Sequence, residues 1–289
     1  MKFSRPVDEI IRERYSCRTY LKKPIDDAAL AGLERQLAGD IPAPFGSRMR
    51  FSIIPAVEGD GEALRRVGTY GMIKDAPAFI AGAIREEGAR LEDYGYRMER
   101  IILAAASTGL GTCWLGGTFS RSDFAGRISL LPEETIPAVA AVGYAADRPR
   151  VMDSVVRFTA GSDRRKAWGE LFFDGGFGAP LAHTSAGAHA AALEMVRLAP
   201  SASNKQPWRI VREKGDGRFH FYLQRTKNYR GRGGFIGISD LQKVDMGIAL
   251  CHFEAAAGEA GLAGSWLVAD PKLPVPDALT EYVVTWEEN

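Results

Sequence analysis

Residues 109–115, Gly-Leu-Gly-Thr-Cys-Trp-Leu, recur as residues 261–267, Gly-Leu-Ala-Gly-Ser-Trp-Leu, with four identities in seven positions. Each copy follows an alanine-rich stretch with helical periodicity, which predicts helices over residues 94–108 and 240–260. A glycine directly after such a stretch is a common helix stop, so the glycine–leucine pair alone carries little weight. The shared tryptophan and the matched residues around it, in the same order, are much less expected by chance. They indicate an internal repeat.

The repeat extends to both sides of this stretch. Gly95 matches Gly247 at the same spacing, and residues 131–134, Leu-Pro-Glu-Glu, match residues 275–278, Val-Pro-Asp-Ala. A repeat of about 150 residues is a duplicated domain rather than a solenoid unit. The mixture of helices and strands therefore predicts an α+β fold, duplicated in tandem as an intramolecular pseudo-dimer. We expect a first half over 1–150, a connecting segment that crosses the surface over 151–185, and a second half over 186–289.

The expected elements follow the same order in both halves. Apolar periodicity predicts helices over 7–14, 28–37, 94–108, 122–130, 186–198 and 240–260. Strands are predicted over 49–55, 78–84, 113–115, 138–144, 208–212, 219–224 and 282–286.

Composition narrows the functional classes. The 289 residues include 37 Lys plus Arg and 36 Asp plus Glu, for a formal net charge of +1. This balance argues against a nucleic-acid binder with a wholly basic surface, but it allows a local cationic pocket for a phosphate. No run approaches about 18 apolar residues and the N-terminus lacks a signal peptide's apolar core, so we expect a cytoplasmic protein with no membrane span. Three scattered cysteines and four histidines without ligand spacing indicate neither a disulfide framework nor a metal site.

A compact group of anion donors stands near the N-terminus, in the sequence Arg-Tyr-Ser-Cys-Arg at residues 14–18. A guanidinium offers a forked pair of N–H donors that matches a phosphate, and Ser16 can add a hydroxyl. Taken alone, these residues are better explained as a charged helix end on the surface.

A polar loop stiffened by two prolines runs over residues 199–208, Ala-Pro-Ser-Ala-Ser-Asn-Lys-Gln-Pro-Trp. Asn204 and Gln206 can each bind a planar edge that presents both donors and acceptors. Taken alone, this loop is better explained as an ordinary turn before a strand.

Residues 109–117 are a third candidate, because glycines in an extended segment let backbone amides approach a ligand closely. The segment lacks the third glycine of a dinucleotide fingerprint. A helix cap followed by a turn also explains it, and the repeat copy supports this explanation, since a cap would recur as well. Two basic stretches, Asp-Arg-Arg-Lys at 163–166 and Arg-Gly-Arg-Gly-Gly at 230–234, are typical of a solvated face and a flexible loop.

Together these motifs resemble the nitroreductase family of FMN-dependent oxidoreductases, and in particular its subgroup with two fused nitroreductase-like halves. The resemblance covers nearly the whole chain: Arg-x-Ser-x-Arg near the N-terminus, a late Arg-Arg-Lys, Pro-Ser-x-x-Asn-x-Gln-Pro-Trp, and a long helix ending in Gly-Leu-Gly-x-x-Trp. In this family FMN lies at a dimer interface. One subunit supplies the arginine motif, the glycine-rich segment and the late basic residues, and its partner supplies the Pro-Ser-x-x-Asn loop.

The resemblance implies a cofactor site divided between the two halves of this chain. Arg14, Arg18 and Arg165 would neutralise the FMN phosphate, the backbone near residues 115–117 would approach the flavin N5 edge, and the loop at 200–204 would contact the ring. The implied FMN-binding residues are Arg14, Ser16, Arg18, Trp114, Leu115, Gly116, Gly117, Arg164, Arg165, Pro200, Ser201, Ala202 and Asn204. No side chain is implied as a catalytic acid, base or nucleophile.

The complementary set of motifs is missing from the sequence. The second half has Ala-His-Thr-Ser-Ala-Gly at 182–187 in place of the arginine motif, and the first half has Ala-Pro-Phe-Gly-Ser-Arg-Met-Arg-Phe at 43–51 in place of the asparagine loop. No Arg-Arg-Lys follows the last predicted strand. We therefore expect one intact FMN site and one degenerate site per chain.

The activity implied by the resemblance is ping-pong electron transfer from NAD(P)H through FMN to a nitroaromatic, a quinone or a similar small acceptor. Two alternatives remain: an FMN-binding or sensing protein of the same fold that does not turn over, and an interaction domain that has lost FMN. We expect no nucleic-acid or membrane partner, and the protein could act as a monomer because its dimer is internal.

Overall fold

The computed structural model describes residues 3–39, 41–56, 69, 71–88, 90–146, 164–215, 217–229 and 239–289. Residues 147–163 of the expected first half and connecting segment, and the glycine-rich loop at 230–234, lie outside these ranges. Among the described helices, none combines the length and the apolar character needed to cross a bilayer.

The first unit is a mixture of helices and short strands. Its helices are α1 (Val7–Glu13), α2 (Asp27–Ala38), α4 (Leu91–Ser107) and α5 (Arg121–Arg127). Its strands are β1 (Met49–Pro55), β2 (Ala78–Arg85), β3 (Gly111–Leu115), β4 (Glu134–Thr135) and β5 (Val139–Gly143).

The second unit repeats this composition after two further elements, α7 (Trp168–Leu171) and β6 (Phe172–Asp174). The α-helix expected over 186–198 begins only at Ala190, as α8 (Ala190–Leu198). The residues before it form the 3-10 helix η1 (His183–His189), which is interrupted at Gly187, where φ is +55°. The remaining elements are η2 (Ala202–Asn204), β7 (Trp208–Arg212), β8 (Arg218–Gln224), α10 (Leu241–Glu259), β9 (Gly264–Leu267) and β10 (Thr280–Glu288).

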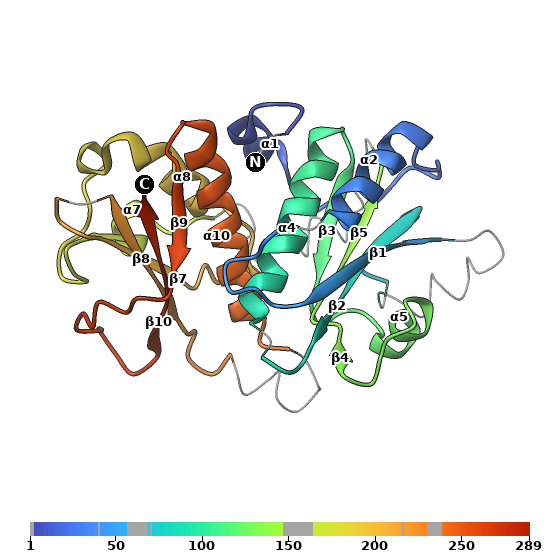
Figure 1. Cartoon of the computed structure of the whole chain (residues 1–289). Coiled ribbons are helices and arrows are strands. Elements are labelled where there is room, and N and C mark those ends of the chain that lie inside the picture. The colour runs from blue at the N-terminus through green and yellow to red at the C-terminus, as the bar shows by residue number, and fades with distance from the viewer. Residues whose placement is uncertain are drawn as a thin grey trace.

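The strands form two sheets that stand on either side of the molecule (Figure 1). The first sheet has the order β1-β2-β5-β3, with β4 paired to β2, and the second has the order β6-β7-β8-β10-β9. The repeat equates β1 with β7, β2 with β8, β5 with β10 and β3 with β9, so the two sheets share one topology apart from β4 and β6. This arrangement confirms the expected α+β fold and its tandem duplication.

The glycine–leucine pairs that begin the repeated stretch end the two long helices in the same way. Gly109 and Gly261 have φ of +83° and +78°, a left-handed conformation that glycine adopts without strain. The following amides, of Leu110 and Leu262, donate back to Ala105 O at 3.1 Å and to Ala257 O at 2.9 Å. This is the Schellman arrangement, which satisfies helix carbonyls and turns the chain into β3 and β9.

The two units meet along α4 and α10, which lie side by side in the centre of the molecule (Figure 1). The matched glycines of the repeat allow this approach. A Cβ on Gly95 would lie 2.0 Å from the Val244 carbonyl oxygen, and a Cβ on Gly247 would lie 1.8 Å from the Glu92 carbonyl oxygen. Any side chain at either position would therefore force the helices apart.

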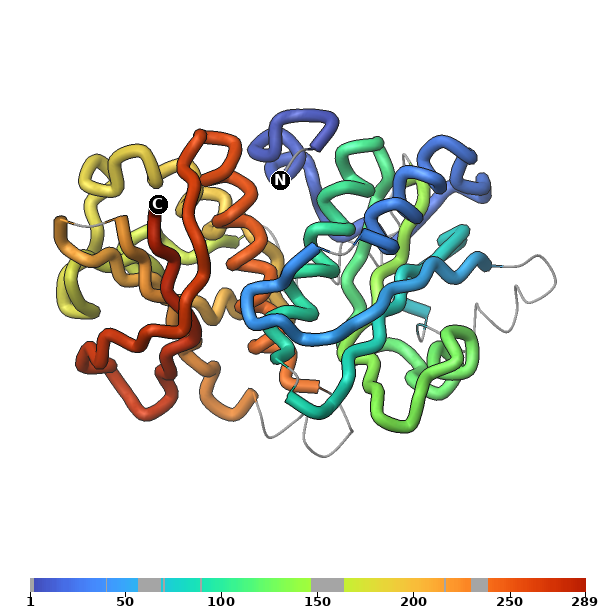
Figure 2. The backbone as a smooth tube through the Cα atoms, in the orientation of Figure 1, coloured from blue at the N-terminus to red at the C-terminus, as the bar shows by residue number. Residues whose placement is uncertain are grey.

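One hydrophobic core continues through this helix contact. It joins Tyr96 and Leu103 of the first unit to Leu193 and Phe253 of the second. The N-terminal segment lies beside the ends of both long helices (Figure 2), and α1 packs against α4, α8 and α10. The two units thus share a core and do not form separate globules.

The connecting segment does not run only over the surface. β6 pairs in parallel with β7, with Phe172 opposite Ile210. Leu171 and Phe172 are fully buried, so the expectation of a surface crossing is wrong for this stretch. The physical reason is that these two apolar residues complete the edge of the second sheet, and the glycines that suggested a surface segment follow them at residues 175–178.

We expect Gly247→Ala to destabilise the protein by about 3 kcal/mol or more, because its methyl group would overlap backbone atoms of α4. Gly258→Ala in the same helix is the matched control. Its added Cβ would meet no heavy atom of the described chain within 4 Å, and alanine favours a helix over glycine by about 1 kcal/mol. Urea unfolding followed by circular dichroism measures both variants, and equal stabilities would contradict the close helix contact.

Candidate functional site

The loop before β7 is held in a backbone conformation that most residues avoid. Ser203, Asn204 and Gln206 have φ of 49°, 53° and 49°, although none of them is glycine. Such left-handed residues cost about 1–3 kcal/mol each and concentrate at ligand sites. The strain favours a binding loop over the ordinary turn that the loop's sequence alone suggested.

The predicted basic residues meet this loop. The Asn204 side-chain amide donates to the Arg164 carbonyl at 2.7 Å, and Arg165 Nη1 donates to Asn204 Oδ1 at 3.3 Å. Gln206 Nε2 donates to the same Arg164 carbonyl at 3.3 Å. The asparagine and glutamine amides thus fix the loop against residues 164–165, and two motifs far apart in the sequence become one structure.

Positive charge gathers at this contact. The Lys166 amide donates to Gln206 Oε1 at 2.8 Å, which brings its side chain beside the loop. Burial, followed by the positive charge of Arg209, lowers the pKa of Lys166 to about 8. Burial also lowers the pKa of Arg209. An anion bound here would offset this mutual repulsion.

The arginine motif lies in an extended segment that runs beside β3. Cys17 N donates to Thr112 O at 2.8 Å, and Ser16 forms a bridge with Thr112. Arg18 Nη1 donates to the Ser16 carbonyl at 3.3 Å. Arg14 Nε and Thr112 Oγ1 are buried and have no hydrogen-bond partner within the described chain. Buried polar groups are normally paired, so these two atoms point to a ligand-binding segment.

A buried carboxylate joins the two units next to this segment. Glu99 of α4 is fully buried, accepts from Trp114 Nε1 at 2.7 Å and contacts His252 Nε2 at 2.9 Å. His252 Nδ1 faces the Met195 carbonyl at 2.9 Å, and because a carbonyl only accepts, Nδ1 carries a proton. Burial by itself raises the pKa of Glu99, but the hydrogen bond and charge of His252, then the charge of Arg14, bring it below its ordinary value.

The glycine-rich segment passes the beginning of α10. A Cβ on Gly116 would lie 2.6 Å from Leu241 Cδ1, so Gly116 of the first unit is packed against the second. Leu115 is buried and Gly117 is exposed. The Trp114 indole is committed to Glu99, which leaves the backbone of this segment as the part available to a ligand.

Helix α8 connects the arginine segment to the asparagine loop. Its Met195 carbonyl faces His252, and one turn later its Leu198 carbonyl accepts from Arg165 Nε at 3.3 Å and Nη2 at 3.1 Å. Glu99 lies on the other side of His252, next to Arg14. Glu99, His252 and α8 therefore link Arg14 of the first half to Arg165, which holds the asparagine loop.

The match to the family described as "Putative TM nitroreductase" covers residues 7–257. The chain belongs to this nitroreductase family. A solved structure from Thermotoga maritima, described as a "putative nitroreductase", is similar over 99% of this chain and 95% of its own, with a TM-score of 0.61 and 18% identity. That similarity over both halves confirms the fold.

Other nitroreductase relatives correspond to about half of this chain. A protein of Methanothermobacter thermautotrophicus named "Putative NADH dehydrogenase/NAD(P)H nitroreductase" is 29% identical over 155 residues, which are 50% of this chain and 80% of its own. A Desulfovibrio desulfuricans structure, described as a "putative nitroreductase in complex with fmn", covers 52% of this chain and 95% of its own at 22% identity and a TM-score of 0.40.

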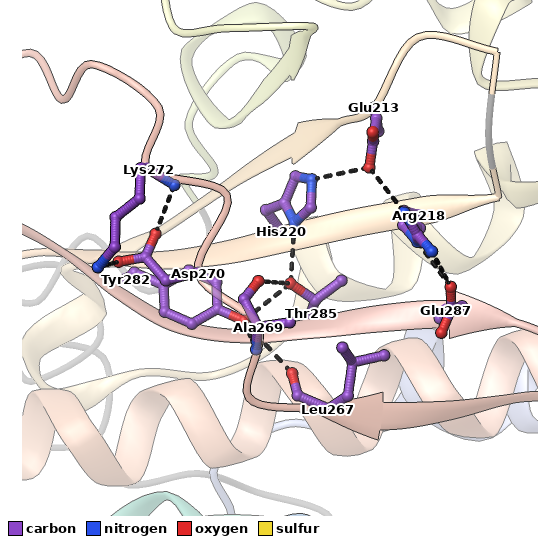
Figure 3. Close-up of polar contacts among 10 residues, drawn as sticks. All are labelled: Glu213, Arg218, His220, Leu267, Ala269, Asp270, Lys272, Tyr282, Thr285 and Glu287. Carbon is purple, nitrogen blue, oxygen red and sulfur yellow. Dashed lines mark hydrogen bonds and ion pairs between the residues drawn. The ribbon is translucent and has the colours of Figure 1, made fainter.

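A second polar network, in the second half of the chain, resembles a hydroxyl–imidazole–carboxylate triad (Figure 3). His220 Nδ1 lies 2.8 Å from Thr285 Oγ1, and His220 Nε2 lies 3.4 Å from Glu213. Thr285 is only 1% exposed, and its hydroxyl also contacts Tyr282 Oη at 2.8 Å and Ala269 O at 3.3 Å. Burial lowers the pKa of His220, although Glu213 opposes this. The Thr285 hydroxyl is already engaged by His220, Tyr282 and Ala269, so this network joins β8 to β10 and is not a nucleophilic site.

A cavity of about 310 Å³ in the second unit lies apart from the predicted site. Its lining includes His189, Arg212, Phe219 and Glu288, and it includes none of the described residues predicted to bind FMN. The Glu288 carboxylate lies 3.4 Å from His189 Nε2 and makes the cavity unsuited to a phosphate.

Four buried residues at the boundary between the units were not predicted from the sequence: Asp93, Glu99, Asp245 and His252. Asp93 and Asp245 stand two residues before Gly95 and Gly247, so a closer comparison of the repeats would have paired them. Glu99 and His252 occupy positions that the other half fills with cysteine and arginine, and no repeat signal marks them.

We expect Glu99→Gln to lower the free energy of unfolding by about 3 kcal/mol at pH 7, because it leaves His252 without its buried carboxylate. The pKa of Glu99 is lower in the folded protein than its unfolded value of about 4.3. Its contribution is therefore present above that pH and is lost as the pH falls through the folded pKa.

Urea titrations between pH 7 and pH 3 measure this contribution, and the difference between wild type and Glu99→Gln should shrink as the pH falls. Glu254→Gln is the control, because Glu254 accepts from Trp266 Nε1 at 2.5 Å and pairs with the Tyr96 hydroxyl, and glutamine can still accept from both. A difference that stays constant with pH would refute the assignment to Glu99.

Proposed function

We propose that this protein is an FMN-dependent oxidoreductase that holds one FMN per chain at the boundary between its two halves. The contact between Arg165 and the strained loop at Asn204 carries the proposal. It joins a cationic segment to a loop of the second half that resembles the flavin loop of the family. Membership of the nitroreductase family supports the same cofactor.

The phosphate end of FMN fits the basic residues of the first half and its exit segment. Arg14, Arg18, Arg164 and Arg165 would hold the phosphate, with Ser16 adding a hydroxyl. The unpartnered Arg14 Nε, judged within the described chain, and the lowered pKa of nearby Lys166 both support an anion here. A phosphate accepts forked guanidinium donors and offsets the repulsion among these cations.

The ring end of FMN fits the two backbone segments that meet at α10. Residues 200–204 would contact the ring from the second half, and the backbone of residues 115–117 would approach its N5 edge from the first. Gly116 supports this role because it packs against Leu241 at the start of α10, where the segment of the first half meets the second half. The loop is preorganised, since Asp245, Arg164 and Arg165 already hold its backbone or its asparagine.

FMN, when bound, supplies hydride and electron transfer at its N5 edge. The residues of this chain bind and orient it. The Trp114–Glu99 bond holds β3 against α4, and with it the position of the glycine-rich segment. Arg165 holds the asparagine loop against α8. We assign no side chain as an acid, base or nucleophile.

NAD(P)H would be the electron donor and a nitroaromatic, a quinone or a similar small molecule the acceptor. The name of the Methanothermobacter thermautotrophicus relative supports a nicotinamide. Each substrate must come within about 3–3.5 Å of the flavin edge, so the two would use the site in turn. Because the internal pair of units completes the site, we expect a monomer to be sufficient.

We expect the purified protein, after incubation with excess FMN and gel filtration, to retain one FMN per chain. The second-half and first-half segments that would form another site lack the arginines and the asparagine. Absorbance at the flavin bands against amino-acid analysis gives the ratio, and two FMN per chain would contradict the degenerate second site. Oxidation of NADH or NADPH by the yellow protein distinguishes an enzyme from a non-turnover flavin-binding protein, and a colourless protein that binds no added FMN would reject both.

We expect Arg165→Ala to weaken FMN binding by about 10- to 100-fold, the loss typical of a charge-assisted hydrogen bond. Riboflavin, which lacks the phosphate, should be affected less. Arg197→Ala is the control. Arg197 lies on α8 and pairs with Glu194 at 2.6 Å, and neither residue is among those predicted to bind FMN. Flavin fluorescence titration gives the affinities. An equal loss of FMN affinity in Arg165→Ala and Arg197→Ala would argue against a phosphate contact of Arg165.

A further inference from the structure

The two long helices carry a matched pair of buried aspartates. Asp93 on α4 and Asp245 on α10 each stand two residues before the glycine of the helix contact, and they are 0% and 2% exposed. Each faces a loop that begins with Ala-Pro, at residues 43–47 in the first half and 199–203 in the second. Their carboxylates therefore have the same structural task in the two units.

The two carboxylates are satisfied differently. Asp93 uses both oxygens: Phe45 N donates to Oδ1 at 2.9 Å, and Ser47 N donates to Oδ2 at 2.8 Å. Asp245 Oδ1 accepts from Ala202 N at 2.8 Å, but Asp245 Oδ2 is buried and has no hydrogen-bond partner within the described residues. The free oxygen belongs to the half whose loop is predicted to bind FMN.

The strained loop explains why the second oxygen is free. Ser203 holds the place of Ser47 in the comparison of the two loops, and its left-handed φ of 49° begins the irregular turn. The loop thus gives up a backbone hydrogen bond that the first half makes. An unsatisfied buried carboxylate oxygen costs about 1–3 kcal/mol or more, which a structure retains where a ligand supplies the partner.

We propose that Asp245 Oδ2 accepts a hydrogen bond from an N–H or O–H group on the ring or ribityl part of FMN. This inference rests on the proposed function and adds to it a ligand contact made by a helix side chain. Burial raises the pKa of Asp245 well above its ordinary value, and a donor from the ligand would offset this by stabilising the carboxylate. The phosphate is not the partner, because its oxygens accept hydrogen bonds and bring no donor to Oδ2. Asp245 would then hold the ring or ribityl part of FMN, while the arginines hold its phosphate.

The test measures the affinity of flavin-free full-length protein for FMN and for riboflavin. Asp245→Asn keeps the shape of the side chain and an oxygen for the Ala202 amide, but it places an NH₂ group where the ligand donor would bind. We expect it to weaken FMN and riboflavin by a similar factor of 10 or more. The melting temperature of the flavin-free variant should stay close to that of the wild type, because one buried polar group without a partner, the carboxylate oxygen, is replaced by another, the amide NH₂.

Asp93→Asn is the matched control and should show the opposite pattern. Both Asp93 oxygens accept backbone amides, so the variant loses a hydrogen bond and several degrees of melting temperature, while flavin affinity stays within twofold. Wild-type flavin affinity in Asp245→Asn, or a loss confined to FMN, would overturn the inference and leave the proposed function intact. A wild-type protein that binds neither flavin would overturn the proposed function itself.

Discussion

The structure depends on the contact of two helix backbones at Gly95 and Gly247. At each glycine, a carbonyl oxygen of the facing helix lies within 2.0 Å of the position that a Cβ would take. At this point α4 and α10 therefore pack without side chains between them. This close approach is what lets Glu99 of one helix reach His252 of the other, each little more than one turn beyond its glycine. The buried pair, the shared core and the gathered site segments all require the helices to stay this close.

The duplicated units have diverged around a common scaffold. Each repeated tryptophan donates its indole N–H to a glutamate of its own long helix, but Glu99 stands 15 residues before Trp114 and Glu254 stands 12 before Trp266. The difference of three residues is close to one helical turn. It places Glu99 fully inside the boundary, whereas Glu254 is only half-buried. Both glutamates therefore reach the other unit, but they meet different partners: Glu99 contacts His252, and Glu254 contacts Tyr96.

Apolar periodicity predicted most of the helices and strands, and the sequence repeat predicted the duplication of the fold. β6 was missed because three residues, Phe172 to Asp174, are too few to show a period, and glycines follow them. The site motifs were found because arginines, glycines and an asparagine keep recognisable spacing. The contact of Glu99 with His252 could not be predicted, because 153 residues separate the two and their positions in the repeat do not match.

β6 can join its sheet only after β7, which follows it in the sequence, has been synthesised. Parallel strands need a crossover connection, and here β6 reaches β7 through η1 and α8. During synthesis β6 emerges from the ribosome before β7 and β8 have been made, so Leu171 and Phe172 have no sheet to pack into until then. A fragment that began at residue 186 would lack this strand and leave the edge of β7 open to pairing with another chain. The covalent join between the halves is thus part of the second sheet as well as a tether.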